Sequence, residues 1–193
     1  MLTLDPRSTV LVLIDLQQGI LGFGKAPHSA DKVLANAAAL AARCRERGAL
    51  VVRVRVGWSS DRLDMVTSPT DTPAPTPAGP LPASWWADPP ALPAVDGDLE
   101  IVKRQWNAFH GTELDLQLRR RGMRTVVLGG LVTPFGVEST ARAGWERGYE
   151  MVFPEDLSSA ALAEQHVHAM THILPRLGRI RSTAEVLAAL DAA

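Results

Sequence analysis

The stretch "GGLVTPFGVESTA" at residues 129–141 joins two segments of different character. Upstream, "TVVLGGLV" (125–132) is an unbroken apolar run, whereas "GVESTARAGWERGYE" (136–150) has apolar residues at three- and four-residue spacing. The first pattern predicts a buried strand and the second a helix. The first turn of that helix should face a ligand, where a nucleophile is expected. The residue at this turn is Gly136.

The same alternation of strand-like and helix-like segments runs through the rest of the chain. Strands are predicted at 9–16, 50–56, 100–104, 125–132, 150–156 and 179–182. Their near-continuous apolar character is typical of strands buried on both faces of a parallel sheet. The sequence therefore predicts one α/β domain over residues 1–193, a Rossmann-like, three-layer α/β/α sandwich with a mainly parallel sheet of roughly six strands. Ligands bind such folds at the carboxyl ends of the strands.

Residues 57–99 interrupt this alternation. They contain nine of the fourteen prolines and the sequence "SWW" at 84–86. A long stretch without periodicity inside a compact domain is either a functional lid or a linker. The tryptophan pair favours a lid, because disordered linkers contain few aromatic residues.

Composition excludes several classes of partner. The net charge is −1, and the Lys and Arg residues are scattered, which argues against nucleic acid. No apolar run approaches the roughly 20 residues that span a bilayer, and the N-terminus has no leader pattern, so we expect no membrane contact and a cytoplasmic location. The only cysteine, Cys44, excludes an internal disulfide and a cysteine-based metal cluster.

Three positions at predicted strand ends carry the candidate chemistry. Asp15 closes the first apolar run, Lys103 closes the third, and Gly136 follows the fourth. The ends of parallel strands lie along one edge of the sheet, so these positions should converge. A buried carboxylate is costly unless it is paired or used. A purely structural ion pair between Asp15 and Lys103 is therefore an alternative to a catalytic role.

Four stretches together resemble the isochorismatase-like (cysteine hydrolase) superfamily, and within it the uncharacterised YecD-type branch. They are "VLVLIDLQQGIL" (10–21), "KRQWNAFHGTELDLQLRRRG" (103–122), "LGGLVTPFGVESTARAGWERGY" (128–149) and "EQHVHAMTHILPRLGRIRSTAEVL" (164–187). The resemblance implies that Asp15 is the catalytic aspartate and Lys103 the catalytic lysine. Gly136 matches the position of the nucleophilic cysteine in amidase members. It also implies a non-proline cis peptide between Leu131 and Val132.

Isochorismatases resemble this chain in having glycine at that position and no covalent intermediate. In them the aspartate is a general acid on a vinyl ether, to which water adds. The resemblance thus implies a cofactor-free hydrolase in which Asp15 protonates the substrate, Lys103 orients it and Gly136 leaves room. An ammonium near Asp15 lowers its pKa, whereas burial raises it. A catalytically inactive member that binds a small molecule or forms a scaffold is the second hypothesis.

The remaining site predictions are less specific. Substrate contacts are predicted for Gln17, His110, Phe135 and the lid residues Trp85 and Trp86, although packing explains the tryptophans equally well. No metal site is predicted, because 57–65 lacks the histidines of the zinc-binding nicotinamidases. His28 and His110 are isolated in the sequence, and His166, His168 and His172 are expected on one helix, solvated or packed. Homodimers or homotetramers are expected by resemblance.

Overall fold

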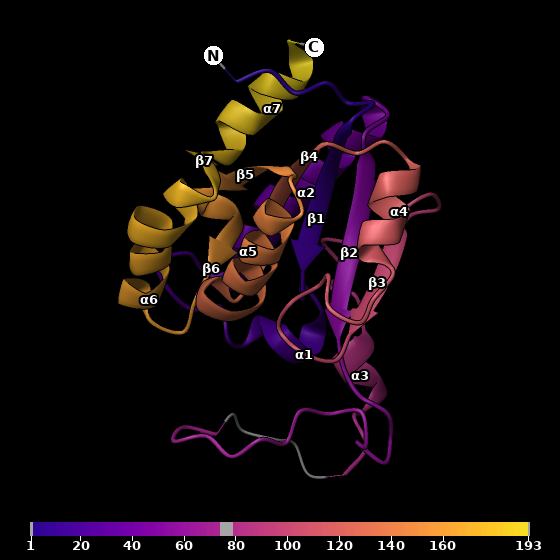
Figure 1. The fold of residues 1–193 in the computed structure, drawn as a ribbon, viewed down its shortest axis with the longest axis vertical. Helices are drawn as coiled ribbons and strands as arrows, with labels where there is room; N and C mark the ends of the chain where they lie inside the picture. The colour runs from indigo at the N-terminus through magenta and orange to yellow at the C-terminus, as the bar shows by residue number, and fades with distance from the viewer. Residues whose placement is uncertain (1, 74–78, 193) are drawn as a thin grey trace.

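The computed structural model describes residues 2–73 and 79–192, which form a parallel sheet covered by helices on both faces (Figure 1). The main order of the strands is β3-β2-β1-β4-β5-β7, and β6 pairs with β4. The strands are β1 (Thr9–Ile14), β2 (Leu50–Val56), β3 (Leu99–Lys103), β4 (Thr125–Leu131), β5 (Glu150–Pro154), β6 (Ser158–Ser159) and β7 (Gly178–Arg181). All strand pairs are parallel, which confirms the predicted fold. The two-residue β6 makes the sheet seven-stranded, one strand more than the rough expectation, because it is too short to leave an apolar pattern.

The helices divide between the two faces of the sheet. They are α1 (Gln18–Leu21), α2 (Ala30–Glu46), α3 (Ala83–Trp86), α4 (Leu114–Arg120), α5 (Glu138–Glu146), α6 (Ala163–His168) and α7 (Thr183–Asp191). Buried residues of α2 and α7 pack with Leu11 and Leu13 of β1. Buried residues of α4 and α5 pack with Val10, Val12 and Ile14 of the same strand. Alternate residues of β1 thus enter two different cores, which is why the strand is apolar throughout.

Four short turns differ from regular α-helix, and one of them replaces the end of the strand predicted at 150–156. They are the π-helical turns η1 (Thr133–Val137) and η3 (Ala169–Ile173) and the 3₁₀ turns η2 (Glu155–Leu157) and η4 (Leu174–Arg176). Pro134 and Pro175 are the second residues of η1 and η4. Pro134 lies in the first turn after β4, where a missing N–H costs no helical hydrogen bond, whereas Pro175 follows η3 and interrupts the helical ladder there.

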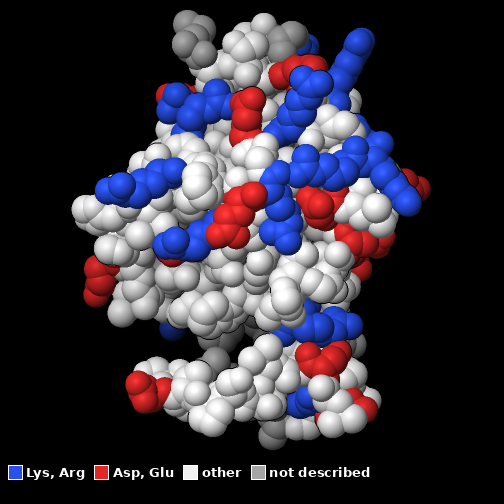
Figure 2. All heavy atoms as spheres, viewed as in Figure 1, with Lys and Arg blue, Asp and Glu red and all other residues white. Residues whose placement is uncertain are grey.

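The predicted lid contains one short regular element, α3, among its described residues. Gln18 N–H donates to the carbonyl of Ala87 at 3.0 Å, which ties the end of α3 to α1. The loop between β2 and α3 instead extends away from the sheet (Figure 1). A space-filling view shows a hollow between this loop and the body (Figure 2). Residues 74–78 of the predicted lid lie outside the described residues.

Strands β1 and β4 approach each other very closely at Gly130. This residue has φ 125°, and a Cβ atom there would lie 2.1 Å from the carbonyl oxygen of Ile14. Such a distance is far inside van der Waals contact, so only glycine fits. The end of β1, which carries Asp15, is thereby held against the end of β4.

Among the described residues, no helix combines the length and the apolar character needed to cross a bilayer.

Candidate active site

Asp15 and Lys103 meet at the carboxyl edge of the sheet although 88 positions separate them in sequence. Lys103 is the last residue of β3, and Asp15 directly follows β1, with β2 between the two strands. Lys103 Nζ lies 2.6 Å from Asp15 Oδ2. The two side chains are 1% and 7% exposed. The sequence-based expectation that these residues converge is therefore met by the geometry, and they form a buried, charge-assisted pair.

The backbone at Asp15 adopts an uncommon conformation. Its φ is 53°, in the left-handed region that few residues other than glycine enter. Its N–H donates to the carbonyl of Val54 at 2.8 Å, so β2 holds this turn in place. Backbone strain of this kind concentrates at functional sites. The conformation turns the chain away from the strand direction directly at the carboxylate.

Burial raises the pKa of Asp15 from 3.8 to about 6, although the Lys103 ammonium and its hydrogen bond lower it. The cost of desolvating the carboxylate thus exceeds the stabilisation by Lys103. Asp15 Oδ1 has no hydrogen-bond partner among the described residues and is inaccessible to solvent. One carboxyl oxygen therefore binds Lys103, and the other is left free to carry a proton or to meet a ligand.

Gly136 lies against this carboxyl group. A Cβ atom on Gly136 would sit 3.3 Å from Asp15 Oδ2 and 2.8 Å from Ile14 Cγ2. Any side chain at this position would thus project beside the acid, as the alignment with a nucleophilic position implied. The predicted cis peptide between Leu131 and Val132 is present and precedes η1. Asp15, Lys103 and Gly136 therefore form one site.

Gln17 is fully occupied by the protein backbone. Its Nε2 donates to the carbonyls of Val56 at 3.1 Å and Trp85 at 3.0 Å, and its Oε1 accepts from Val56 N–H at 2.8 Å. The side chain links the end of β2 to α3 in the lid. Its predicted hydrogen bond to substrate stays a prediction, and the structure gives it an anchoring role that sequence reasoning missed.

The two lid tryptophans pack against glycines. Trp85 covers Gly19, where an added Cβ would lie 2.5 Å from the ring, and Trp86 covers Gly57, where the distance would be 1.9 Å. Trp85 Nε1 also donates to the carbonyl of Val56 at 2.8 Å. Both rings hold α3 onto the body, and their predicted contact with substrate stays untested.

An exposed aromatic pair lies beside the buried site. Phe135 precedes Gly136, is 40% exposed and packs against Trp106, with the rings tilted by 36° and 4.8 Å between the ring centroids. The neighbouring Gln105 carbonyl accepts a hydrogen bond from Lys103 Nζ at 3.2 Å. Trp106 therefore belongs to the surroundings of the site, a role its sequence pattern did not reveal.

His110 lies farther along the same loop. Its side chain is exposed, and its carbonyl accepts a hydrogen bond from Gln105 Nε2 at 2.6 Å. No interaction of its imidazole with Asp15 or Lys103 is present, so its predicted place at the pocket border stays a prediction.

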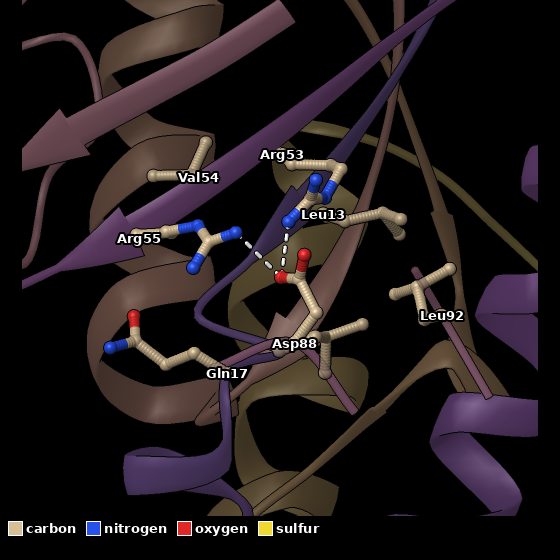
Figure 3. Close-up of a pocket in the computed structure, with 8 residues that line it drawn as sticks. Leu13, Gln17, Arg53, Val54, Arg55, Asp88 and Leu92 are labelled. Carbon is tan, nitrogen blue, oxygen red and sulfur yellow. Dashed lines mark hydrogen bonds and ion pairs between the residues drawn. The ribbon is translucent and has the colours of Figure 1, made fainter. Parts of the chain in front are cut away.

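A small cavity lies beside Leu13 of β1, on the face of the sheet that α2 and α7 cover (Figure 3). Arg53 and Arg55 of β2 both bind the carboxylate of Asp88, which follows α3; the Arg55–Asp88 distance is 2.6 Å. The cavity is lined by Leu13, Leu16, Gln17, Arg53, Val54, Arg55, Asp88 and Leu92. The Asp88 carboxylate of the lid neutralises Arg53 and Arg55, so these two arginines anchor the lid.

His28 is isolated in the sequence but not in the structure. Its Nε2 lies 2.9 Å from Glu155 Oε1, and the same oxygen lies 2.9 Å from His166 Nε2. His28 lies 127 positions from Glu155 in sequence, so only the fold reveals the group. His166 is fully buried and turned away from the exposed His168 and His172.

Comparisons with known proteins agree with this architecture. Residues 9–185 match the family described as Isochorismatase domain. The chain is 54% identical to the uncharacterised isochorismatase family protein YecD of Escherichia coli O157:H7, over 98% of this chain and 100% of that protein. It is 41% identical to the uncharacterised isochorismatase family protein YwoC of Bacillus subtilis (strain 168), over 96% of each. An isochorismatase family protein of known structure from Burkholderia thailandensis is 40% identical and superimposes with a TM-score of 0.92 over 99% of both chains.

Proposed function

The chain belongs to the isochorismatase family, and we propose that it is a cofactor-free hydrolase of a small molecule in which Asp15 is the general acid. The observation that carries the proposal is the state of Asp15. Burial raises its pKa to about 6 even with Lys103 at 2.6 Å, and Oδ1 has no partner. A carboxyl group poised near neutral pH with a free oxygen is suited to proton transfer.

In the proposed reaction, the substrate is a vinyl ether or a related electron-rich compound. The Asp15 carboxyl transfers its proton to the terminal alkene carbon, and the adjacent carbon becomes an oxocarbenium ion. Water adds to that carbon and returns a proton to Asp15. The resulting hemiketal then breaks into a ketone and an alcohol. Lys103 holds the Asp15 carboxyl in position throughout and stabilises the carboxylate formed after the first transfer.

The charge around the site favours a neutral or weakly acidic substrate. A dicarboxylate would need free arginine side chains. Arg53 and Arg55 are bound to Asp88, and Arg104 is bound to Asp64 at 2.6 Å. The lid arginine, Arg62, donates to the carbonyl of Gly79. Isochorismate itself is therefore not our preferred substrate.

Thiol chemistry finds no support among the residues present. Gly136 supplies no nucleophile. Cys44 lies in α2 on the other face of the sheet, and burial raises its pKa to about 12. A thiol with such a pKa is protonated at neutral pH and unreactive.

An inactive, ligand-binding or scaffold protein is the alternative, and one observation favours it. Asp15 is 5% exposed and Lys103 is 1% exposed, so the pair is closed to bulk solvent. A substrate would reach it only after movement of a covering segment.

A substrate screen with three proteins and one control variant tests the proposal. Wild type, Asp15→Asn and Gly136→Cys are assayed against vinyl ethers, isochorismate included, and against small amides. We expect the wild type to hydrolyse a vinyl ether and Asp15→Asn to lose at least ~100-fold in kcat/KM, the size of a general acid contribution. Gly136→Cys combined with Cys44→Ala serves as the control that assigns any thiol activity to position 136. If Gly136→Cys hydrolyses amides while the wild type hydrolyses none of the substrates, the result would support the alternative.

We also propose an assembly and a location for the protein. The exposed Trp106–Phe135 pair and the loop that stands off the body (Figure 2) support a homodimer or homotetramer, which light scattering would detect. Interspersed charges of both signs on the face in Figure 2 support the absence of a nucleic-acid partner. A cytoplasmic location stays a prediction.

A further inference from the structure

His28, Glu155 and His166 form a compact group at one end of the sheet, outside the Asp15 site. One nitrogen from each imidazole and one carboxylate oxygen all lie within 4.8 Å of one another. His28 precedes α2, Glu155 begins η2 after β5, and His166 lies in α6. Three separate segments therefore present ligand atoms to one point.

The hydrogen bonds around His166 fix which of its nitrogens carries a proton. Thr133 Oγ1 has a single hydrogen, which it donates to the carbonyl of Ser159 at 3.0 Å. His166 Nδ1 lies 2.8 Å from the same Oγ1, so Nδ1 must be the donor in this contact. In neutral His166 the other nitrogen, Nε2, therefore presents a lone pair.

That lone pair faces a negatively charged oxygen. His166 Nε2 lies 2.9 Å from Glu155 Oε1, which has no hydrogen to donate when ionised. Two acceptors at this distance repel unless a positive centre lies between them. A proton on His166 would supply it only by placing a charge on a fully buried ring. A cation held by both groups satisfies all the atoms.

We propose that His28, Glu155 and His166 bind a divalent transition metal of the zinc class. Two imidazole nitrogens and a carboxylate are a ligand set that zinc commonly takes, with water at the fourth position. The Glu155 side chain is 40% exposed and that of His28 is 23% exposed, so water and metal can enter from that side. The Thr133–His166 hydrogen bond orients the ligand from behind, as outer-shell partners of metal-bound histidine do.

The surrounding backbone holds the ligands close to their required positions. Ser159 Oγ donates to the carbonyl of His28 at 2.6 Å. The preceding Ala26 exchanges two backbone hydrogen bonds with Ala160, at 3.0 and 2.9 Å. Ligand atoms on a tetrahedral zinc ion with bonds of ~2.0–2.2 Å lie roughly 3.3 Å from one another. The present N···O separations of 2.9 Å are slightly shorter, so binding would draw the partly exposed Glu155 carboxylate outward. A bound metal would link the end of β5, α6 and the start of α2.

Metal binding is tested on chelator-treated protein with Zn²⁺ and Co²⁺ as probes. We expect one metal ion per chain, a visible absorption band typical of tetrahedral Co²⁺, and a rise in Tm on addition of Zn²⁺. His28→Ala and Glu155→Gln should each weaken affinity by more than the ~10–100-fold that loss of an outer-shell partner costs. Both positions are partly exposed, so these variants should fold, which circular dichroism confirms.

The matched control is the double variant His168→Ala/His172→Ala. These exposed histidines lie one helical turn apart, with ring centroids 5.2 Å apart, and such a pair can bind metal on its own. The proposal requires that this variant bind Zn²⁺ like the wild type. Binding that disappears in the control but persists in His28→Ala would overturn the proposal, as would a wild type whose Tm does not respond to metal.

Discussion

Replacing Lys103 by methionine should keep Asp15 protonated to higher pH. In the wild type the pKa of Asp15 rises from 3.8 to about 6 on folding, because burial outweighs Lys103. At about 1.4 kcal/mol per pH unit, this rise corresponds to ~3 kcal/mol of unfolding free energy. The pKa is higher in the folded protein, so this stability is fully present below pH 3.8 and is lost as pH rises to about 6.

Lys103→Met removes the ammonium that lowers the pKa of Asp15, so the loss of stability should continue above pH 6. Each further pH unit should cost ~1.4 kcal/mol until the new pKa is reached. Urea unfolding of Lys103→Met and of Lys103→Met/Asp15→Asn between about pH 5 and about pH 8 isolates this term, because only the first protein retains the carboxyl group. Carboxyl-carbon NMR titration of Asp15 in the wild type and in Lys103→Met provides the direct measurement. No substrate is needed for either measurement.

A wild-type Asp15 that titrates near its usual value, or a pKa that Lys103→Met leaves unchanged, would refute the reasoning. The first result would mean that Lys103 offsets burial in full, and Asp15 would then be a carboxylate at neutral pH. Such a group could not act as the general acid near neutral pH.

Two substitutions test the packing around the site. Gly136→Ala should lower the free energy of unfolding by ~1–3 kcal/mol, because its Cβ would lie 2.8 Å from Ile14 Cγ2. Gly22→Ala is the control and should leave the Tm nearly unchanged, because a Cβ there has nothing within 4 Å. Equal Tm values for the two variants would contradict the described packing. Gln17→Leu should lower the free energy of unfolding by ~1–3 kcal/mol and make the lid more sensitive to protease, because the backbone groups of Val56 and Trp85 lose their hydrogen-bond partner. The control Gln18→Leu, at an exposed position, should change neither stability nor protease sensitivity.

The pattern of apolar residues predicted the parallel sheet because the residues of each strand indicate how far that strand is buried. The β1 and β4 runs are apolar on both faces, and this local property indicates their central place. Strand β6 was not predicted, because its two serines form no apolar pattern. The convergence of Asp15 and Lys103 followed from the geometry of parallel strands, whereas their assignment as catalytic came from family resemblance.

Groups that depend on loop paths could not be predicted in this way. The His28–Glu155–His166 group forms only because the loop before α2 pairs with the segment after β6. No spacing rule joins residues 28, 155 and 166. The anchoring role of Gln17 was hidden for the same reason, since its neighbour Gln18 has the same chemistry and faces solvent.

The close approach at Gly130 affects how mutational scans of this isochorismatase family member should be interpreted. Every other residue there would push its Cβ into the backbone of Ile14, one position before Asp15. A saturation library scored by turnover would therefore report Gly130 as intolerant as any catalytic position. Abundance measured in parallel would separate the two causes, because substitutions at Gly130 should deplete the folded protein while Asp15→Asn should leave it present and inactive.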